Sequence, residues 1–250
     1  MLKINNLSVK VANHKVLNSF DLNIDDGEIH AIMGKNGIGK SSLCKTIMHD
    51  LDYEIIHGDI IFNNERINDL PTNEIALKGI MLISQNPPAI EGVTNAEMLR
   101  TVLRNKNDEK LNIFAFNQEL ETICDELKLD HSFIHKEINV GASGGERKKI
   151  ELLHMGILKP SFVILDEIDS GLDVDSMKVV ADYINKYHQE TKCSILIITH
   201  HHNILKYLKP NYVHILEQGK IVKTGDHHLA EEIEEKGYST NIIDEDGKNE

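Results

Sequence analysis

The stretch Gly34-Lys35-Asn36-Gly37-Ile38-Gly39-Lys40-Ser41 decides the fold of this chain. It fits the phosphate-binding pattern G-x-x-x-x-G-K-[ST] at every fixed position. An apolar segment, 28–33, precedes it, and the segment 40–49 that follows is expected to be helical. A strand that leads into a glycine-rich loop and then a helix directs backbone N–H groups and the helix dipole at an anion. The stretch therefore predicts a site for nucleotide phosphates in an α/β domain.

The residue types of this loop have separate expected roles. Its glycines allow a tight path and a close approach to the phosphates. Lys40 places a positive charge at the β- and γ-phosphates, and the Ser41 hydroxyl is expected to hold Mg²⁺. The predicted nucleotide-binding set also includes the next serine and comprises Gly34, Lys35, Asn36, Gly37, Ile38, Gly39, Lys40, Ser41 and Ser42.

Two later segments add to this loop. Ser143-Gly144-Gly145-Glu146 is followed by an apolar strand, 162–166, that ends in Asp166 and is succeeded by Glu167. A carboxylate at the end of such a strand is expected to hold the metal, so Asp166 has this role. Glu167 is the candidate general base for the attacking water. A glutamate at a strand end is in isolation more simply a solvated residue, but the combination of motifs favours the base.

Together these motifs resemble the ATP-binding cassette (ABC) family over nearly the whole chain. The resemblance implies that Gln85, after the strand 80–83, contacts the metal and the attacking water, and that His200, after the strand 194–199, contacts the γ-phosphate. It also implies that two copies sandwich two ATP molecules. The implied catalytic set is Lys40, Gln85, Glu167 and His200; the metal set is Ser41, Gln85 and Asp166; and the residues that reach the partner's nucleotide are Ser143, Gly144, Gly145 and Asp173.

Some positions depart from the family pattern. Ala142 replaces the leucine that usually begins the signature. Val11 occupies the expected place of the aromatic residue that stacks on adenine, so the residue that contacts the base cannot be named. A metal site built from the histidines 200–202 with 227–228 is an alternative that we disfavour, because consecutive side chains leaving a strand point in different directions.

The segments that follow the proposed base resemble one branch of the family, the SufC-type ATPases. Transporter cassettes commonly have an uncharged residue where this chain has Asp169, in the loop that faces the other subunit. The likeness rests on the segments 143–149, 166–175, 178–182, 209–216, 219–226 and 234–238. This resemblance implies a soluble ATPase, Mg²⁺-dependent, that drives conformational change in a SufB/SufD-type scaffold for iron–sulfur cluster assembly. The alternative is the ATP-binding subunit of an importer that is bound to a membrane permease.

The resemblance also suggests how partner and activity are linked. A partner helix is expected in a groove between the α/β core and the helical region, near Gln85 and the segment 86–88. The segment 89–93 either lines this groove or is a plain surface loop. One residue of Arg147-Lys148-Lys149 is expected to pair with Glu167 and to restrain it until the dimer closes. Slow hydrolysis by the isolated chain would follow.

The expected fold is α/β: a P-loop ATPase of the ABC type with an N-terminal antiparallel β subdomain and an inserted α-helical subdomain. One domain fills 1–250, with 1–93 and 140–238 as the core, about 94–139 as the helical subdomain, and about 239–250 as a flexible acidic tail. Within the insertion, apolar residues at steps of four, three and four predict one buried helical face. These residues are Phe116, Leu120, Ile123 and Leu127.

Composition excludes several other classes of protein. The 250 residues have a net charge of −13, which argues against nucleic-acid binding and against adhesion to anionic lipid. No apolar run is long enough to span a bilayer, and the first residues do not form a signal peptide, so we expect a cytoplasmic protein. Three widely separated cysteines, 44, 124 and 193, are expected to be reduced, partly buried thiols rather than metal ligands. A single phosphate-binding loop argues against two-cassette ribosomal ATPases, and the lack of heptads argues against chromosome ATPases.

Overall fold

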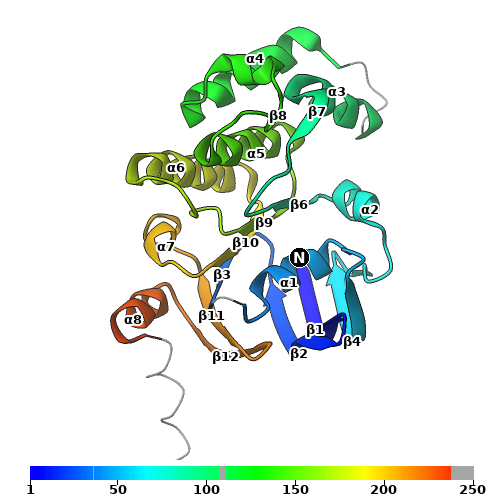
Figure 1. Ribbon diagram of the computed structural model, residues 1–250, viewed down its shortest axis with the longest axis vertical. Coiled ribbons are helices and arrows are strands. Elements are labelled where there is room, and N and C mark those ends of the chain that lie inside the picture. Colours follow the sequence, from blue (N-terminus) through cyan, green and yellow to red (C-terminus); the bar gives the residue numbers. More distant parts are fainter. Residues whose placement is uncertain (36, 107–110, 238–250) are drawn as a thin grey trace, which may run out of the picture.

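The computed structural model describes residues 1–35, 37–106 and 111–237. Asn36 and the predicted acidic tail, 239–250, lie outside the described residues. Figure 1 shows helices stacked above a central sheet, with a second sheet of N-terminal strands beside it.

The N-terminal strands form an antiparallel sheet of their own, as predicted. Its order is β2-β1-β4-β5. Alternating apolar residues of these strands point inward and pack on the helix that follows the phosphate-binding loop, α1 (Lys40–Ile47), so this sheet shares a hydrophobic core with one face of the central sheet. The strands are β1 (Leu2–Val11), β2 (His14–Ile24), β4 (Tyr53–Phe62) and β5 (Glu65–Arg66). The structure starts β4 earlier than the strand 58–62 expected from sequence.

The central sheet has the order β12-β11-β3-β10-β9-β6, and all its pairs except β11–β12 are parallel. Its inner strands are continuous apolar runs because both faces are covered by other elements. The strands are β3 (Ile29–Met33), β6 (Ile80–Ile83), β9 (Phe162–Asp166), β10 (Ser194–Thr199), β11 (Tyr212–Glu217) and β12 (Lys220–Gly225).

Helices cover this sheet and connect its strands. Pro71 is the N-cap of α2. A C-terminal helix, α8, was not expected from the sequence, although its residues Leu229, Ala230 and Ile233 are buried. The helices are α1 (Lys40–Ile47), α2 (Thr72–Leu77), α5 (Gly144–Leu158), α6 (Val174–Thr191), α7 (Asn203–Leu208) and α8 (His228–Lys236).

The inserted subdomain lies at the top of Figure 1 and consists of α3 (Asn95–Lys106), α4 (Ile113–Leu127) and the 3-10 helix η1 (His131–His135). Two short strands, β7 (Ile90–Thr94) and β8 (Glu137–Ile138), pair where the chain enters and leaves it. The four apolar residues predicted to share a face of α4 are all buried. The subdomain core is continuous with the apolar side of α5 and α6.

The register of the parallel strands determines where the functional residues lie. Met33 is level with Thr199, and Asp166 is level with Ile198. Because parallel strands end at one edge of the sheet, the loops after β3, β6, β9 and β10 leave it side by side. These loops begin with Gly34, Ser84, Glu167 and His200.

Candidate nucleotide-binding and catalytic site

The glycines of the phosphate-binding loop are required by its close packing. Gly39 has a φ of 105°, and a Cβ there would lie 2.6 Å from the carbonyl oxygen of Val16. A Cβ on Gly34 would lie 2.7 Å from the carbonyl oxygen of Leu216. Side chains at these two positions would force the loop away from the β subdomain and the central sheet.

Lys40 directs its ammonium group into the loop. Its Nζ donates hydrogen bonds to the carbonyl oxygens of Gly34, at 2.6 Å, and Lys35, at 2.8 Å. Burial lowers the pKa of Lys40, and the nearby carboxylates of Glu167 and Asp166 oppose this shift. The loop thus presents a fixed, partly desolvated positive charge, which suits the binding of phosphate oxygens.

Oxygen ligands for a divalent cation gather beside this lysine. The Ser41 hydroxyl donates to Oδ1 of Asp166 at 3.1 Å, across 125 positions of sequence. Burial raises the pKa of Asp166, while the bond from Ser41 lowers it. A hydroxyl, a carboxylate and the side-chain oxygen of Gln85 are hard ligands of the kind that Mg²⁺ prefers. The three predicted metal residues therefore fit the ion chemically.

Two side chains hold the carboxylate of Glu167. Gln85 Nε2 donates to Oε2 at 2.5 Å, and His200 Nδ1 lies 3.0 Å from Oε1. The Glu167 backbone has a φ of 49°, and its N–H donates to the carbonyl oxygen of Ile198 at 2.8 Å. The predicted base, Gln85 and His200 are thus brought together although they lie in three separate loops.

Two cavities flank the phosphate-binding loop. The first, of about 570 Å³, is lined by all the polar side chains described above except His200. Its lining comprises Gly37, Gly39, Lys40, Ser41, Ser42, Lys45, Tyr53, Ser84, Gln85, Asn86, Asp166 and Glu167. The second, of about 550 Å³, lies on the side of the β subdomain and is lined by His14, Lys15, Val16, Lys35, Gly37, Ile38, Gly39, Ser42 and 215–219. The loop therefore separates a phosphate and metal compartment from a compartment that can take the rest of a nucleotide.

His14 is a site residue that the sequence analysis missed. It lines the second cavity, whereas Val11, the position examined for a base-stacking residue, does not. Val11 and His14 are paired across the β1–β2 hairpin. A search for Tyr or Phe overlooked the imidazole ring, and the pairing across a two-residue turn is the signal that would have found it.

The residues assigned to the partner's nucleotide lie apart from both cavities of their own chain. Ser143 is the N-cap of α5 and forms a capping box with Glu146. Gly144 is exposed, and a Cβ on it would meet no described atom within 4 Å. Asp173 is exposed and caps α6 by accepting from the Ser176 N–H at 2.7 Å. The open N-terminus of α5 has the character of an anion-binding site, and its role across a dimer stays a prediction.

The expected pairing of a basic residue with the Glu167 carboxylate is wrong in this structure. Lys148 is buried, but its Nζ donates to main-chain carbonyls: those of Gln85 at 2.6 Å, Ser84 at 3.0 Å and Glu167 at 3.4 Å. Arg147 instead donates to the Ala142 carbonyl. Three carbonyl acceptors satisfy the ammonium group, so Lys148 joins α5 to the loops after β6 and β9 and leaves the carboxylate to Gln85 and His200.

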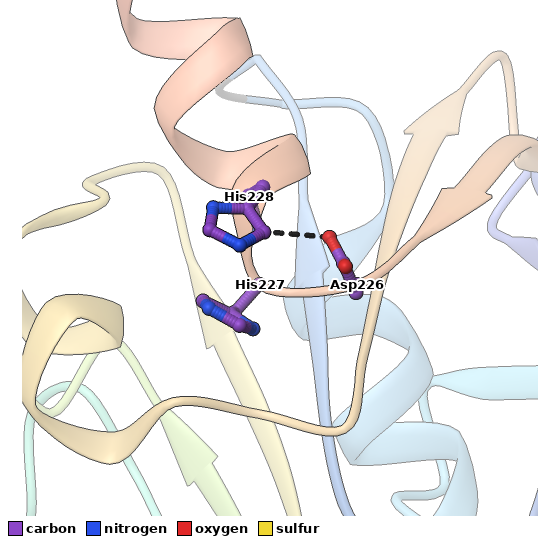
Figure 2. Close-up of side chains that lie close together, drawn as sticks. All are labelled: Asp226, His227 and His228. Atoms are coloured by element: carbon purple, nitrogen blue, oxygen red, sulfur yellow. Dashed lines mark hydrogen bonds between the residues drawn. The ribbon is translucent and has the colours of Figure 1, made fainter.

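The disfavoured histidine cluster is not formed as such. His200 turns to Glu167, and His202 Nε2 lies 2.5 Å from Glu234. Elsewhere, ligand atoms of Asp226, His227 and His228 lie within 4.8 Å of one another at the start of α8 (Figure 2). Asp226 Oδ1 there accepts from the His228 N–H at 3.0 Å, which gives it a capping role.

The predicted cysteine environment is confirmed. Cys44, Cys124 and Cys193 are buried free thiols. Burial raises the pKa of Cys124 to about 11. Among the described residues, no helix is both long and apolar enough to cross a membrane.

Comparisons with known proteins agree with this geometry. The model of the family described as ABC transporter matches residues 17–170. The "Probable ATP-dependent transporter SufC" of Escherichia coli is 42% identical over 242 residues, which cover 95% of this chain and 97% of that protein. The "Iron-sulfur cluster assembly protein SufC" of Plasmodium falciparum is 41% identical over 245 residues, which cover 96% of this chain and 70% of that protein. A "Probable ATP-dependent transporter ycf16" of Antithamnion sp. is 41% identical and covers 95% and 96%.

Solved structures support the fold. A dimeric ATP-binding cassette in a post-hydrolysis state with ADP and phosphate has a TM-score of 0.78 at 20% identity, covering 91% of this chain and 99% of that one. A nucleotide-free cassette from an ABC transporter has a TM-score of 0.75 at 21% identity, covering 98% and 97%. The chain belongs to the ABC ATPase family and, within it, to the SufC/ycf16 type. Membership implies hydrolysis of ATP.

Proposed function

We propose that this chain is a Mg²⁺-dependent ATPase that acts as an ATP-bound homodimer and drives conformational change in SufB/SufD-type scaffold proteins for iron–sulfur cluster assembly. The observation that best supports ATPase activity is that Gln85 and His200 both contact the Glu167 carboxylate beside the phosphate-binding loop. The assembly role is supported by the similarity to the iron–sulfur cluster assembly protein SufC of Plasmodium falciparum. The cytoplasmic location expected from the sequence stays a prediction.

The hydrolytic step can be assigned to residues of this chain. Glu167 accepts a proton from the attacking water, which makes the oxygen nucleophilic. Gln85 and His200 keep its carboxylate oriented, and orientation of this kind lowers the entropic part of the barrier. Lys40 neutralises charge that develops on the phosphate oxygens. Bound Mg²⁺, held by Ser41, Gln85 and Asp166, would supply further charge neutralisation.

The dimer is proposed because the exposed N-terminus of α5 lies apart from both nucleotide cavities of its own chain. Ser143, Gly144 and Gly145 begin α5 and line neither described cavity of their own chain. An isologous two-fold arrangement would bring this N-terminus to the partner's ATP, with Asp173 in the loop that crosses the interface. The cassette structure similar to this chain was itself solved as a dimer.

A groove between the core and the helical subdomain is the proposed docking surface for the scaffold. Met81 and Leu82 of β6, Leu77 of α2 and Val102 of α3 line it, and its surface is largely apolar. Leu77 is 56% exposed, which is unusual for a leucine in a single-chain core. An apolar face of a partner helix suits such a groove. The segment 89–93, for which groove lining and a plain surface loop were both open, does not line this groove, and 90–94 forms β7.

The test measures ATP turnover of the purified chain with and without a purified SufB/SufD-type scaffold. Lys40→Ala is the inactive control. We expect the scaffold to stimulate turnover and Leu77→Glu to abolish the stimulation. Phe114→Glu is the matched control, because Phe114 is 79% exposed on α4 but does not line the groove.

Two results would contradict the proposal. Turnover no greater than that of Lys40→Ala would remove the ATPase. Equal turnover with and without scaffold, together with recovery of an integral membrane permease from native extracts, would favour the importer reading of the family.

A further inference from the structure

Asp169 is a buried carboxylate that the proposed mechanism does not use. Its side chain is 4% exposed, and it follows Ile168, which is fully buried. The sequence suggested an extra charge in a loop that faces a second subunit, but the structure turns this side chain inward. Burial raises the pKa of Asp169, and a bond from Thr199 opposes the shift. A carboxylate that is taken out of water in this way needs a specific partner to be tolerated.

That partner is the residue directly before His200. Thr199 Oγ1 lies 3.1 Å and 3.0 Å from the two oxygens of Asp169. The same Oγ1 accepts a hydrogen bond from the His201 N–H at 2.9 Å. Thr199 is fully buried, so water does not compete for its hydroxyl. The hydroxyl has one proton and three acceptors within reach, the two Asp169 oxygens and the His201 carbonyl oxygen at 3.1 Å, and a carboxylate oxygen is a stronger acceptor than a carbonyl oxygen.

The Asp169–Thr199 hydrogen bond joins the turn after β9 to the end of β10, just before His200. Asp169 belongs to the turn between Glu167 and Asp173, in which Ser170 N–H donates to the Glu167 carbonyl and Leu172 N–H donates to the Asp169 carbonyl. The other loop carries His200. A second bond between the same loops joins Glu167 to His200 at 3.0 Å. A movement of one loop therefore strains the other.

We propose that Asp169 is a positioning residue: through Thr199 it fixes the backbone on which His200 is presented to Glu167 and the γ-phosphate. The turn that contains Asp169 leads to Asp173, which is predicted to cross the dimer interface. The Asp169–Thr199 hydrogen bond therefore couples contact with the partner subunit to the position of His200. The proposal rests on the proposed ATPase function. It differs from that function because it concerns how His200 is held, not which groups react.

The test uses Thr199→Val, which keeps the shape of the side chain and removes the hydroxyl. We expect kcat for ATP to fall about tenfold with KM within about twofold, because the bond orients a group needed in the transition state and not for binding. Thr199→Ser keeps the hydroxyl and should remain within about twofold of the parent in kcat. Thermal unfolding and ATP binding of each variant report whether it is folded.

Epistasis with His200 separates positioning from general damage. In a His200→Ala background, Thr199→Val should lower kcat by less than about twofold, because its effect passes through the missing side chain. A merely structural role would lower kcat by the same factor in both backgrounds. If Thr199→Val does not fold, Asp169→Asn replaces it, with a several-fold fall expected only when His200 is present.

The outcomes can be told apart. Parental kcat for folded Thr199→Val, or an equal loss with and without His200, overturns the positioning role while leaving the ATPase intact. A parental chain that hydrolyses no more ATP than Lys40→Ala overturns the proposed function itself.

Discussion

Replacing Glu167 by Gln is the sharpest change that the site allows. The carboxylate is held by Gln85 Nε2 and His200 Nδ1. A glutamine has the same shape, can direct its oxygen to Gln85, and can donate from its amide nitrogen to a deprotonated His200 Nδ1. The site should therefore keep its geometry and its ATP affinity. The amide cannot accept the proton of the attacking water.

The expected size of the effect follows from the role of the group. Positioned general bases contribute about 100- to 10,000-fold to a rate. We therefore expect kcat to fall at least about hundredfold, with ATP binding retained. Phosphate release measured at saturating ATP reports the first quantity, and equilibrium binding of a fluorescent ATP analogue reports the second.

Two controls make this result interpretable. Glu121→Gln makes the same chemical change at an exposed position of α4 and should leave turnover at the parental value. Lys40→Ala should lose binding as well as turnover. Turnover of Glu167→Gln at the parental rate would refute the assignment of the base, and loss of ATP binding would refute the argument that the amide preserves the site.

Three further changes test other parts of the site. Ser143→Arg should abolish turnover. Mixing it with inactive Lys40→Ala should restore part of the activity, because one of the two nucleotide sites of the mixed dimer then has both an intact Lys40 and an intact Ser143. No recovery in a titration of the mixture would contradict the prediction that Ser143 acts on the partner's nucleotide. His14→Ala should raise the KM for ATP several-fold with kcat little changed, because the imidazole lines the second cavity; unchanged kinetics would remove it from the base site. The Nε2 of His154 lies 2.6 Å from Asn95 Oδ1, and burial lowers the pKa of His154 to about 4. The unfolded chain, in which the pKa of this histidine is about 6.5, therefore binds the proton more readily. The free energy of unfolding should fall as the pH drops below about 6.5, by about 2 kcal/mol at about pH 5. His154→Gln keeps a donor for Asn95 and should remove that part of the loss in urea unfolding at about pH 8 and about pH 5; an unchanged pH dependence would contradict the assignment.

The fold was largely predictable because the strong signals are local. Short, continuous apolar runs such as 162–166 and 194–199 are typical of strands that are covered on both faces. The phosphate-binding loop fixes the order strand, loop, helix. The helix α8 was missed because its acidic residues mask three buried apolar positions. The early start of β4 was missed because pairing with β1 imposes strand structure on a segment with little alternation.

The candidate site was predictable where a motif fixes a residue's place on the chain. Asp166 ends a central strand, and Lys40, Glu167 and His200 lie in the segments that follow central strands, so the register of the sheet brings them together. Contacts that depend on side-chain direction were not predictable. One residue of 147–149 was expected to pair with the Glu167 carboxylate, but Lys148 donates to main-chain carbonyls instead. Asp169 was expected in a loop that faces a second subunit, and its side chain is buried.

The central claim is that two copies of the chain enclose two ATP molecules. Light scattering of Glu167→Gln, with and without ATP and Mg²⁺, tests it most directly. The claim predicts twice the mass of the chain only when both are present, and the mass of one chain when Ser143→Arg is added to the same variant. One-chain mass for Glu167→Gln at saturating ATP would contradict it.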